Sequence, residues 1–151
     1  MIIKSFELEK IDLNANKIIL FYGKNEGLKK SAIDQLTKNR DNISTYYQDE
    51  IMDSHDKLLE SIYSKSLFET QKTIIIRRAT DKLLNLIKKI NIQKIEDTII
   101  LISAEILEKK SKLRSTFEKS KSNVVVAFYP DTDQILIKLA LNFLQKKKIT
   151  I

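Results

Sequence analysis

Short apolar runs, each followed by a segment with helical spacing, constrain the fold of this chain more than any other feature. Clear runs cover residues 17–22, 73–77, 98–102 and 123–129, and a weaker run covers 43–47. Runs of this length with little polar alternation are typical of strands buried on both faces of a parallel sheet. The pattern therefore predicts an α/β fold, a three-layer parallel sheet with helices on both faces.

The segments between these runs have the spacing of amphipathic helices. We predict helices over 26–36, from a cap at Asp53 or Ser54 through Ile62, over 80–90 and over 111–119. The first ten residues fit a short strand followed by a helical turn. With the last apolar run, the sheet is complete by Tyr129.

Pro130 separates this predicted domain from one more helix, over 132–147. That helix has more apolar side chains than a trailing helix normally shows, and the remaining residues are too few to cover them. We therefore expect two units: residues 1–129 form the α/β domain, and residues 130–151 begin a second, helical domain that is truncated. Packing of the helix against the first domain is the alternative.

Charge and composition narrow the function classes. Lys and Arg total 27 against 20 acidic residues, a net charge of +7 that suits nucleic acid or an acidic partner surface. Most lysines fall at predicted helix ends, where they favour the helix dipole. There is no cysteine, which excludes disulfides and thiol nucleophiles, and His55 is the single histidine. No apolar run approaches a membrane span, so we expect a soluble, cytoplasmic protein without membrane contact.

Gly23 follows a predicted strand and precedes a helix, which is where a phosphate-binding loop G-x-x-x-x-G-K-[ST] would lie. Lys29 keeps the lysine of that motif, but Leu28 replaces the second glycine and Lys30 replaces the hydroxyl. Leu28 would crowd the phosphate, and Lys30 places a cation where Mg²⁺ should be held. We expect no ATP binding in the usual mode and no cofactor.

Acidic residues give no better sign of catalysis. The run 98–102 ends in Ser103 and Ala104, with Glu105 beyond, where an ATPase would place a metal-binding carboxylate. Asp49 and Glu50 are neighbours on a predicted exposed turn. No nucleophile, base and oxyanion site come together in the sequence, so we expect a protein that is not an enzyme.

Leu67 and Phe68 stand side by side in a polar stretch, after Lys65 and Ser66 and before the run 73–77. Adjacent residues point in different directions on a helix or a strand, so the pair does not continue a regular apolar face. The commoner interpretation of such a pair is that both side chains pack under the edge of the sheet. The other is that they are exposed and fit a pocket on a partner.

Five stretches, taken together, resemble the sequence pattern of a known family. In order, they are Phe21–Gly27, Leu58–Phe68, Thr73–Arg77, Thr98–Ser103 and Phe128–Pro130. In their order and spacing the chain resembles the delta subunit of bacterial DNA polymerase III, the clamp-loader wrench, over essentially all 151 residues. The resemblance implies an ATPase-like (AAA+-like) fold without working Walker motifs. It also implies a non-catalytic part of a DNA-directed DNA polymerase.

The same resemblance implies the partners. Leu67 and Phe68, with Lys65 and Ser66, would bind the beta sliding clamp and open its ring for loading onto or unloading from DNA during replication. The other clamp-loader subunits, delta prime and gamma/tau, would be partners of the full-length protein, and DNA an indirect one. They assemble through a helical collar domain, for which this chain has no counterpart.

Two alternatives come from the residues themselves. One is a small P-loop-like nucleotide-binding enzyme with a divergent loop, which nucleotide would stabilise against heat. The other is a basic nucleic-acid-binding α/β domain, whose affinity for DNA would fall steeply with salt. The clamp-binding interpretation accounts for more of the chain than either.

Overall fold

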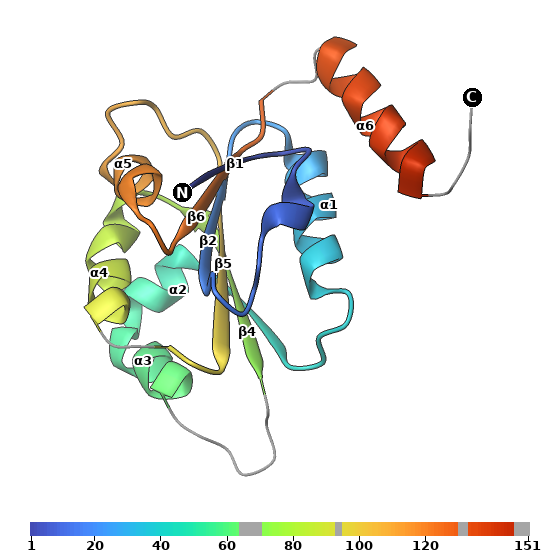
Figure 1. Cartoon of the computed structure of the whole chain (residues 1–151). Helices are drawn as coiled ribbons and strands as arrows, with labels where there is room; N and C mark the ends of the chain where they lie inside the picture. Colours follow the sequence, from blue (N-terminus) through green and yellow to red (C-terminus); the bar gives the residue numbers. More distant parts are fainter. Residues whose placement is uncertain (64–70, 93–94, 130–132, 147–151) are drawn as a thin grey trace.

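In the computed structural model, which describes residues 1–63, 71–92, 95–129 and 133–146, the strands form one six-stranded parallel sheet (Figure 1). The strands are β1 (Ile2–Lys4), β2 (Ile18–Tyr22), β3 (Ile43–Tyr47), β4 (Lys72–Ala79), β5 (Thr98–Ala104) and β6 (Val124–Ala127). Their order across the sheet is β1-β6-β2-β5-β4-β3, and every neighbouring pair is parallel. The predicted parallel α/β fold is confirmed.

The helices connect these strands. They are α1 (Glu26–Thr37), α2 (Gln48–Asp53), α3 (His55–Tyr63), α4 (Leu84–Ile92), α5 (Lys112–Lys119) and α6 (Asp133–Lys146), with the 3-10 turns η1 (Leu8–Lys10) and η2 (Asp81–Leu83). None of the described helices is long and apolar enough to cross a lipid bilayer.

The central strands explain the apolar runs. Every residue of β2 and of β5 is buried, and Ile18 of β2 pairs with Ile100 of β5. On its other side β2 pairs with β6, where Ile19 faces Val124. By contrast, the edge strand β3 alternates exposed and half-buried residues, which is why its run is weaker. Burial on both faces thus selects continuous apolar sequence only in the middle of the sheet.

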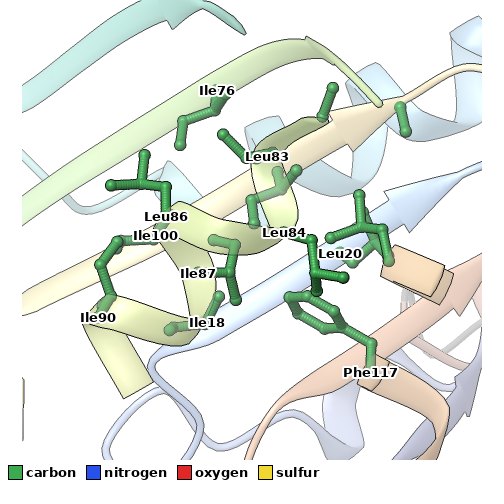
Figure 2. Packing of buried hydrophobic residues seen from close by; sticks show 14 of the residues in the cluster. Ile18, Leu20, Ile76, Leu83, Leu84, Leu86, Ile87, Ile90, Ile100 and Phe117 are labelled. Carbon is green, nitrogen blue, oxygen red and sulfur yellow. The ribbon is translucent and has the colours of Figure 1, made fainter. Parts of the chain in front are cut away.

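Helices cover both faces of the sheet. Helix α1 packs on one face, against side chains such as Phe21 and Leu101, while α2 to α5 pack on the other. Figure 2 shows that second face, with Ile87 and Ile90 of α4 against Ile18 of β2. Each fully buried side chain of this size contributes about 1.5–3 kcal/mol relative to its exposed state. The two faces together make the three-layer arrangement that we predicted.

One predicted boundary is wrong. The chain is already helical from Gln48, so Asp49 and Glu50 lie in the first turn of α2 rather than on an exposed turn. Carboxylates are favoured there because the amino end of a helix carries positive partial charge. The Glu50 side chain also accepts a hydrogen bond from the amide of Tyr47 at 3.2 Å. The backbone leaves the helical region at Ser54, and α3 then begins as a separate helix.

Helix α6 lies against the α1 side of the α/β domain (Figure 1). Asn142 donates a hydrogen bond to the carbonyl oxygen of Phe6 at 3.2 Å, and the Lys138 ammonium lies 4.6 Å from the centre of the Phe6 ring. An apolar groove of about 470 Å³ separates α6 from α1 and the amino-terminal segment. The apolar side chains that α6 leaves exposed are Leu136, Ile137, Leu141 and Phe143. A domain boundary after residue 129 stays a prediction.

The first and last strands of the sheet are neighbours. Ile2 of β1 pairs with Val125 of β6. The Met1 ammonium donates hydrogen bonds to the carbonyl oxygens of Phe117 and Asn123, both at 2.9 Å. The amino end of the chain is therefore held against residues that follow it by more than a hundred positions.

Candidate functional site

The sheet has a topological switch point at β2. After β2 the chain passes through α1 to β3 at one edge, whereas after β5 it crosses β2 to reach β6 on the other side. In open α/β sheets, ligands bind beyond the carboxyl ends of the strands at such a point. The crevice beyond β2 and β5 is thus the first place to look for a site, and Gly23 and Glu105 both border it.

Gly23 serves the fold at this point. Its φ of +122° is in a region that side-chain-bearing residues rarely adopt, and a Cβ there would lie 2.0 Å from the carbonyl oxygen of Phe128. Its amide donates to the carbonyl oxygen of Glu105. The glycine is required for the close approach to Phe128, and its amide is used within the protein.

Lys29 lies at the motif's lysine position and is almost fully buried, with 1% of its surface exposed. Its ammonium donates to the Glu26 carboxylate at 2.5 Å and to the carbonyl oxygen of Ala104 at 2.8 Å. A buried ammonium is tolerated only when it is paired and hydrogen-bonded in this way. The cation that would neutralise a phosphate therefore ties α1 to the carboxyl end of β5.

The other two residues of the degenerate loop diverge. Leu28 is half-buried and packs with the apolar cluster on the α1 face, whereas Lys30 is exposed. The amide of Leu28 donates to the Asn25 side chain at 3.1 Å, which caps α1. That cap occupies an amide at the helix terminus where a phosphate would bind. The structure brings Gly23 and Lys29 to the crevice, but not Leu28 and Lys30.

Sequence reasoning missed two arginines at the same edge of the sheet. Arg77 and Arg78 lie near the carboxyl end of β4 and, with Tyr47 and Ser103, line a pocket of about 240 Å³ beside Lys29. The only signal in the sequence is that two cations directly follow an apolar run. Guanidinium groups at this edge repel a metal ion. In the described residues, no three His, Cys, Asp or Glu side chains come together as metal ligands would.

Two further polar groups near this edge hold elements together. Asp81 accepts hydrogen bonds from the Ser111 hydroxyl at 2.6 Å and from the Leu113 amide at 3.2 Å, which fixes the start of α5. These hydrogen bonds hold the pKa of Asp81 below its usual value, and the bond from Ser111 has the largest effect.

Tyr22 is a second polar group near this edge. Burial, reinforced by Tyr129, raises the pKa of Tyr22, whose ring lies 5.0 Å from the Arg114 guanidinium. A phenol held neutral in this way is no catalytic base.

The predicted clamp-binding residues Lys65, Ser66, Leu67 and Phe68 lie outside the described residues. Their described neighbours lie at the amino edge of the sheet. Lys72 begins β4, and its ammonium donates to the carbonyl oxygen of Ser61 at 2.9 Å. The Thr98 hydroxyl, at the start of β5, donates to the carbonyl oxygen of Ile62 in α3 at 3.3 Å. The chain thus enters and leaves this segment at the edge opposite the crevice.

Comparison by sequence finds no matching protein family and no matching curated protein. Comparison by structure finds the Bacillus subtilis DNA clamp loader delta protein, with a TM-score of 0.69 and 13% identity over 95% of this chain and 46% of that one. C. elegans PCH-2 follows, with a TM-score of 0.50 and 14% identity over 95% of this chain and 44% of that one. Domain III of the Thermotoga maritima replication initiation protein DnaA has a TM-score of 0.45.

The chain has a clamp-loader-like α/β fold. The chain spans about half the length of the first two proteins, at 46% and 44%. With 13% identity to the clamp loader protein, the likeness is one of fold.

Proposed function

We propose that this chain is the clamp-binding domain of a delta-type clamp-loader subunit. In this proposal it binds a ring-shaped sliding clamp and favours opening of the ring, without catalysis of its own. The observation that carries the proposal is the fold similarity, a TM-score of 0.69 over 95% of this chain, to a DNA clamp loader delta protein. The ordered motifs of the sequence support the same assignment independently of the fold.

The contacts of Lys29 support a non-catalytic role. An ATPase needs this ammonium for the phosphates of the nucleotide. Here Glu26 and the carbonyl oxygen of Ala104 hold it inside the protein, and Arg77 and Arg78 occupy the neighbouring edge where a metal ion would need carboxylates. ATP control would then come from other subunits of the loader.

Leu67 and Phe68 would make the contact with the clamp, with Lys65 and Ser66 beside them. A ligand moves an equilibrium only by its differential affinity for the two states. Two apolar side chains that bind the clamp more tightly when its ring is open at a subunit interface would supply that difference in affinity. The described neighbours of this segment lie at the amino edge of the sheet, away from the crevice beyond β2 and β5, so opening of the clamp would not depend on nucleotide.

The test is a binding measurement between this chain and the beta sliding clamp. If both side chains are buried in a clamp pocket, each contributes about 1.5–3 kcal/mol. Replacing both by alanine (L67A/F68A) should weaken binding by roughly two to four orders of magnitude, at about 1.4 kcal/mol per tenfold change. The melting temperature should change little, because exposed side chains add little to stability.

A matched control removes two exposed apolar side chains elsewhere. Leu136 and Ile137 on α6 are 49% and 59% exposed, and L136A/I137A should leave clamp affinity unchanged. A large loss of thermal stability in L67A/F68A would show that the pair belongs to the core. In that case the clamp-binding assignment of these two residues is wrong.

A further inference from the structure

The pocket beside Lys29 brings two arginine side chains together from consecutive positions of one strand. Arg77 and Arg78 both line it, with Tyr47 of the neighbouring strand β3. Tyr47 is the direct cross-strand partner of Arg77. Consecutive residues of a regular strand point to opposite faces, so a regular strand would not place both arginines in one pocket.

A β-bulge makes the arrangement. Between Ile76 and Ala79 strand β4 advances three residues, while its partner β5 advances two, from Ile102 to Ala104. Ile76 and Ala79 both face the core on the α4 side of the sheet. Without the extra residue, Arg78 would take the place of Ala79 and point into that core. The bulge instead turns Arg78 outward to the pocket.

The bulge places Arg78 in a costly backbone conformation. Its φ is +56°, in the left-handed region that residues other than glycine seldom adopt, and no other non-glycine residue among those described has a positive φ. A glycine at this position would relieve the strain and form the same bulge. The arginine side chain therefore needs an explanation beyond the shape of the strand.

The charges of the pocket favour an anion. Glu26 and Lys29 neutralise each other, which leaves Arg77 and Arg78 against the single carboxylate of Glu105. Within the described part of the chain, neither arginine makes a hydrogen bond or an ion pair; the Arg78 guanidinium lies 5.3 Å from the centre of the Tyr47 ring. Two unpaired guanidinium groups facing one cavity match the geometry of a phosphate group.

We propose that Arg77 and Arg78 form a binding site for a phosphate oxyanion, with the ring of Tyr47 beside it. Three sources supply this chemistry: the phosphodiester backbone of a nucleic acid, a nucleotide and free phosphate. The small excess of positive charge in the pocket favours the singly charged phosphodiester, and the ring of Tyr47, 45% exposed, offers a face on which a base can stack. This site is separate from the proposed clamp-binding residues.

The test compares Arg77→Gln with Lys38→Gln in the same chain. Lys38 is exposed at the carboxyl end of α1, so both variants lose one positive charge and share the same non-specific electrostatic change. The probe is a fluorescein-labelled oligothymidylate, followed by anisotropy at fixed salt. R77Q should weaken binding about tenfold to a hundredfold, as expected for lost hydrogen bonds to a charged group, and K38Q about twofold. Equal losses in the two variants would overturn the proposal.

Competition identifies the source of the phosphate. Unlabelled oligonucleotide should displace the probe from the wild-type chain, while ATP and inorganic phosphate at equal phosphate concentration should not. ATP or inorganic phosphate could instead displace the probe from the wild-type chain but not from R77Q. That result would support an oxyanion site at Arg77 whose ligand is a nucleotide or free phosphate.

A second variant separates binding from folding. Arg78→Gly should raise the melting temperature, because glycine relieves the positive φ, while it weakens oligonucleotide binding. Loss of binding together with a gain in stability cannot come from damage to the fold. Clamp affinity should be the same in R77Q, R78G and the wild type. If R78G binds the oligonucleotide as the wild type does, Arg78 is not part of an anion site.

Discussion

The ammonium of Lys29 in α1 lies 2.8 Å from the carbonyl oxygen of Ala104, the last residue of β5. The same ammonium lies 2.5 Å from the Glu26 carboxylate, one turn earlier in its own helix. In a nucleotide-binding loop, the lysine at this position binds the phosphates of the nucleotide. Here it joins a helix to the central part of the sheet.

The first prediction follows for nucleotide. ATP with Mg²⁺ should not raise the melting temperature, since the lysine is committed, Asn25 caps the helix and Lys30 replaces the hydroxyl that would hold Mg²⁺. Thermal unfolding at millimolar ATP, with and without Mg²⁺, checks this. Micromolar affinity for ATP by calorimetry, or any hydrolysis, would contradict it.

The second prediction concerns Lys29 itself. Lys29→Met keeps most of the side-chain length but removes the donor to the buried carbonyl oxygen of Ala104. Leaving a buried polar group without its partner costs about 1–3 kcal/mol, and we expect that loss in urea unfolding. Lys30→Met, at the exposed next position, should change stability by no more than about 0.5 kcal/mol. Equal effects of the two changes would argue against the role of Lys29 in the fold.

The two glycines of the sequence give the third prediction. Gly23→Ala puts a Cβ 2.0 Å from the carbonyl oxygen of Phe128, at a φ of +122°, and should cost about 3 kcal/mol. Gly27→Ala is the matched control because its Cβ would have no contact closer than 3.8 Å, in a helix. It should stabilise by about 0.5 kcal/mol through a less flexible unfolded state. Equal effects in denaturant unfolding would be inconsistent with this geometry.

The fourth prediction is a pH dependence that comes from Asp81. Its pKa is lowered in the folded protein, by the Ser111 hydroxyl first, so its carboxylate stabilises the fold above the unfolded pKa of about 3.9. That contribution is lost as the pH falls through the lower folded pKa. Asp81→Asn should therefore destabilise at neutral pH by about 1 kcal/mol, because hydrogen bonds to a charged acceptor are stronger than those to a neutral amide, and by less in acid.

Unfolding midpoints of Asp81→Asn and wild type, measured from neutral pH to below pH 4, test this convergence. Asp34→Asn, at an exposed position of α1, is the control and should differ little from wild type throughout. A difference between D81N and wild type that is constant with pH would rule out the carboxylate as its cause.

The fifth prediction concerns the proposed function. This chain should release sliding clamp from nicked circular DNA without any nucleotide, because the described neighbours of the proposed clamp-binding residues lie at the amino edge of the sheet, opposite the crevice. Clamp is loaded onto the DNA, the chain is added without ATP, and clamp loss is followed by gel filtration. L67A/F68A should not accelerate the loss. Tight binding by the unmodified chain with no faster release would mean that binding alone does not open the ring.

The apolar pattern predicted most of the fold because burial on both faces leaves few residue types that fit. β2 was expected over 17–22 and spans Ile18–Tyr22, and β5 was expected over 98–102 and extends to Ala104. The helix at 48–53 was missed, since it is short and its exposed carboxylates resemble a turn. The Gln48 side chain also accepts a hydrogen bond from the Thr80 amide at 2.7 Å, and a contact across 32 residues leaves no local signal in the sequence.

The candidate sites divide in the same way. The sequence shows directly that Leu28 and Lys30 depart from a phosphate-binding loop. It does not show that Lys29 donates to the carbonyl oxygen of Ala104, because that partner lies on β5, far along the chain. The bulge at Arg78 could not be predicted, because bulges with a positive φ usually carry glycine. Leu67 and Phe68 lie outside the described residues, and their role stays a prediction from the sequence.

The pairing of Ile2 with Val125 has a consequence for how the protein is made. A ribosome adds about 5–20 residues per second from the amino end, so β1 leaves the exit tunnel well before its partner β6 exists. Strand β2 pairs with β5 on one side and with β6 on the other. Its apolar side chains therefore stay uncovered until both of these later strands have been synthesised. Most of this chain must therefore be synthesised before the central strands can be covered on both sides, and until then their apolar side chains are exposed to solvent.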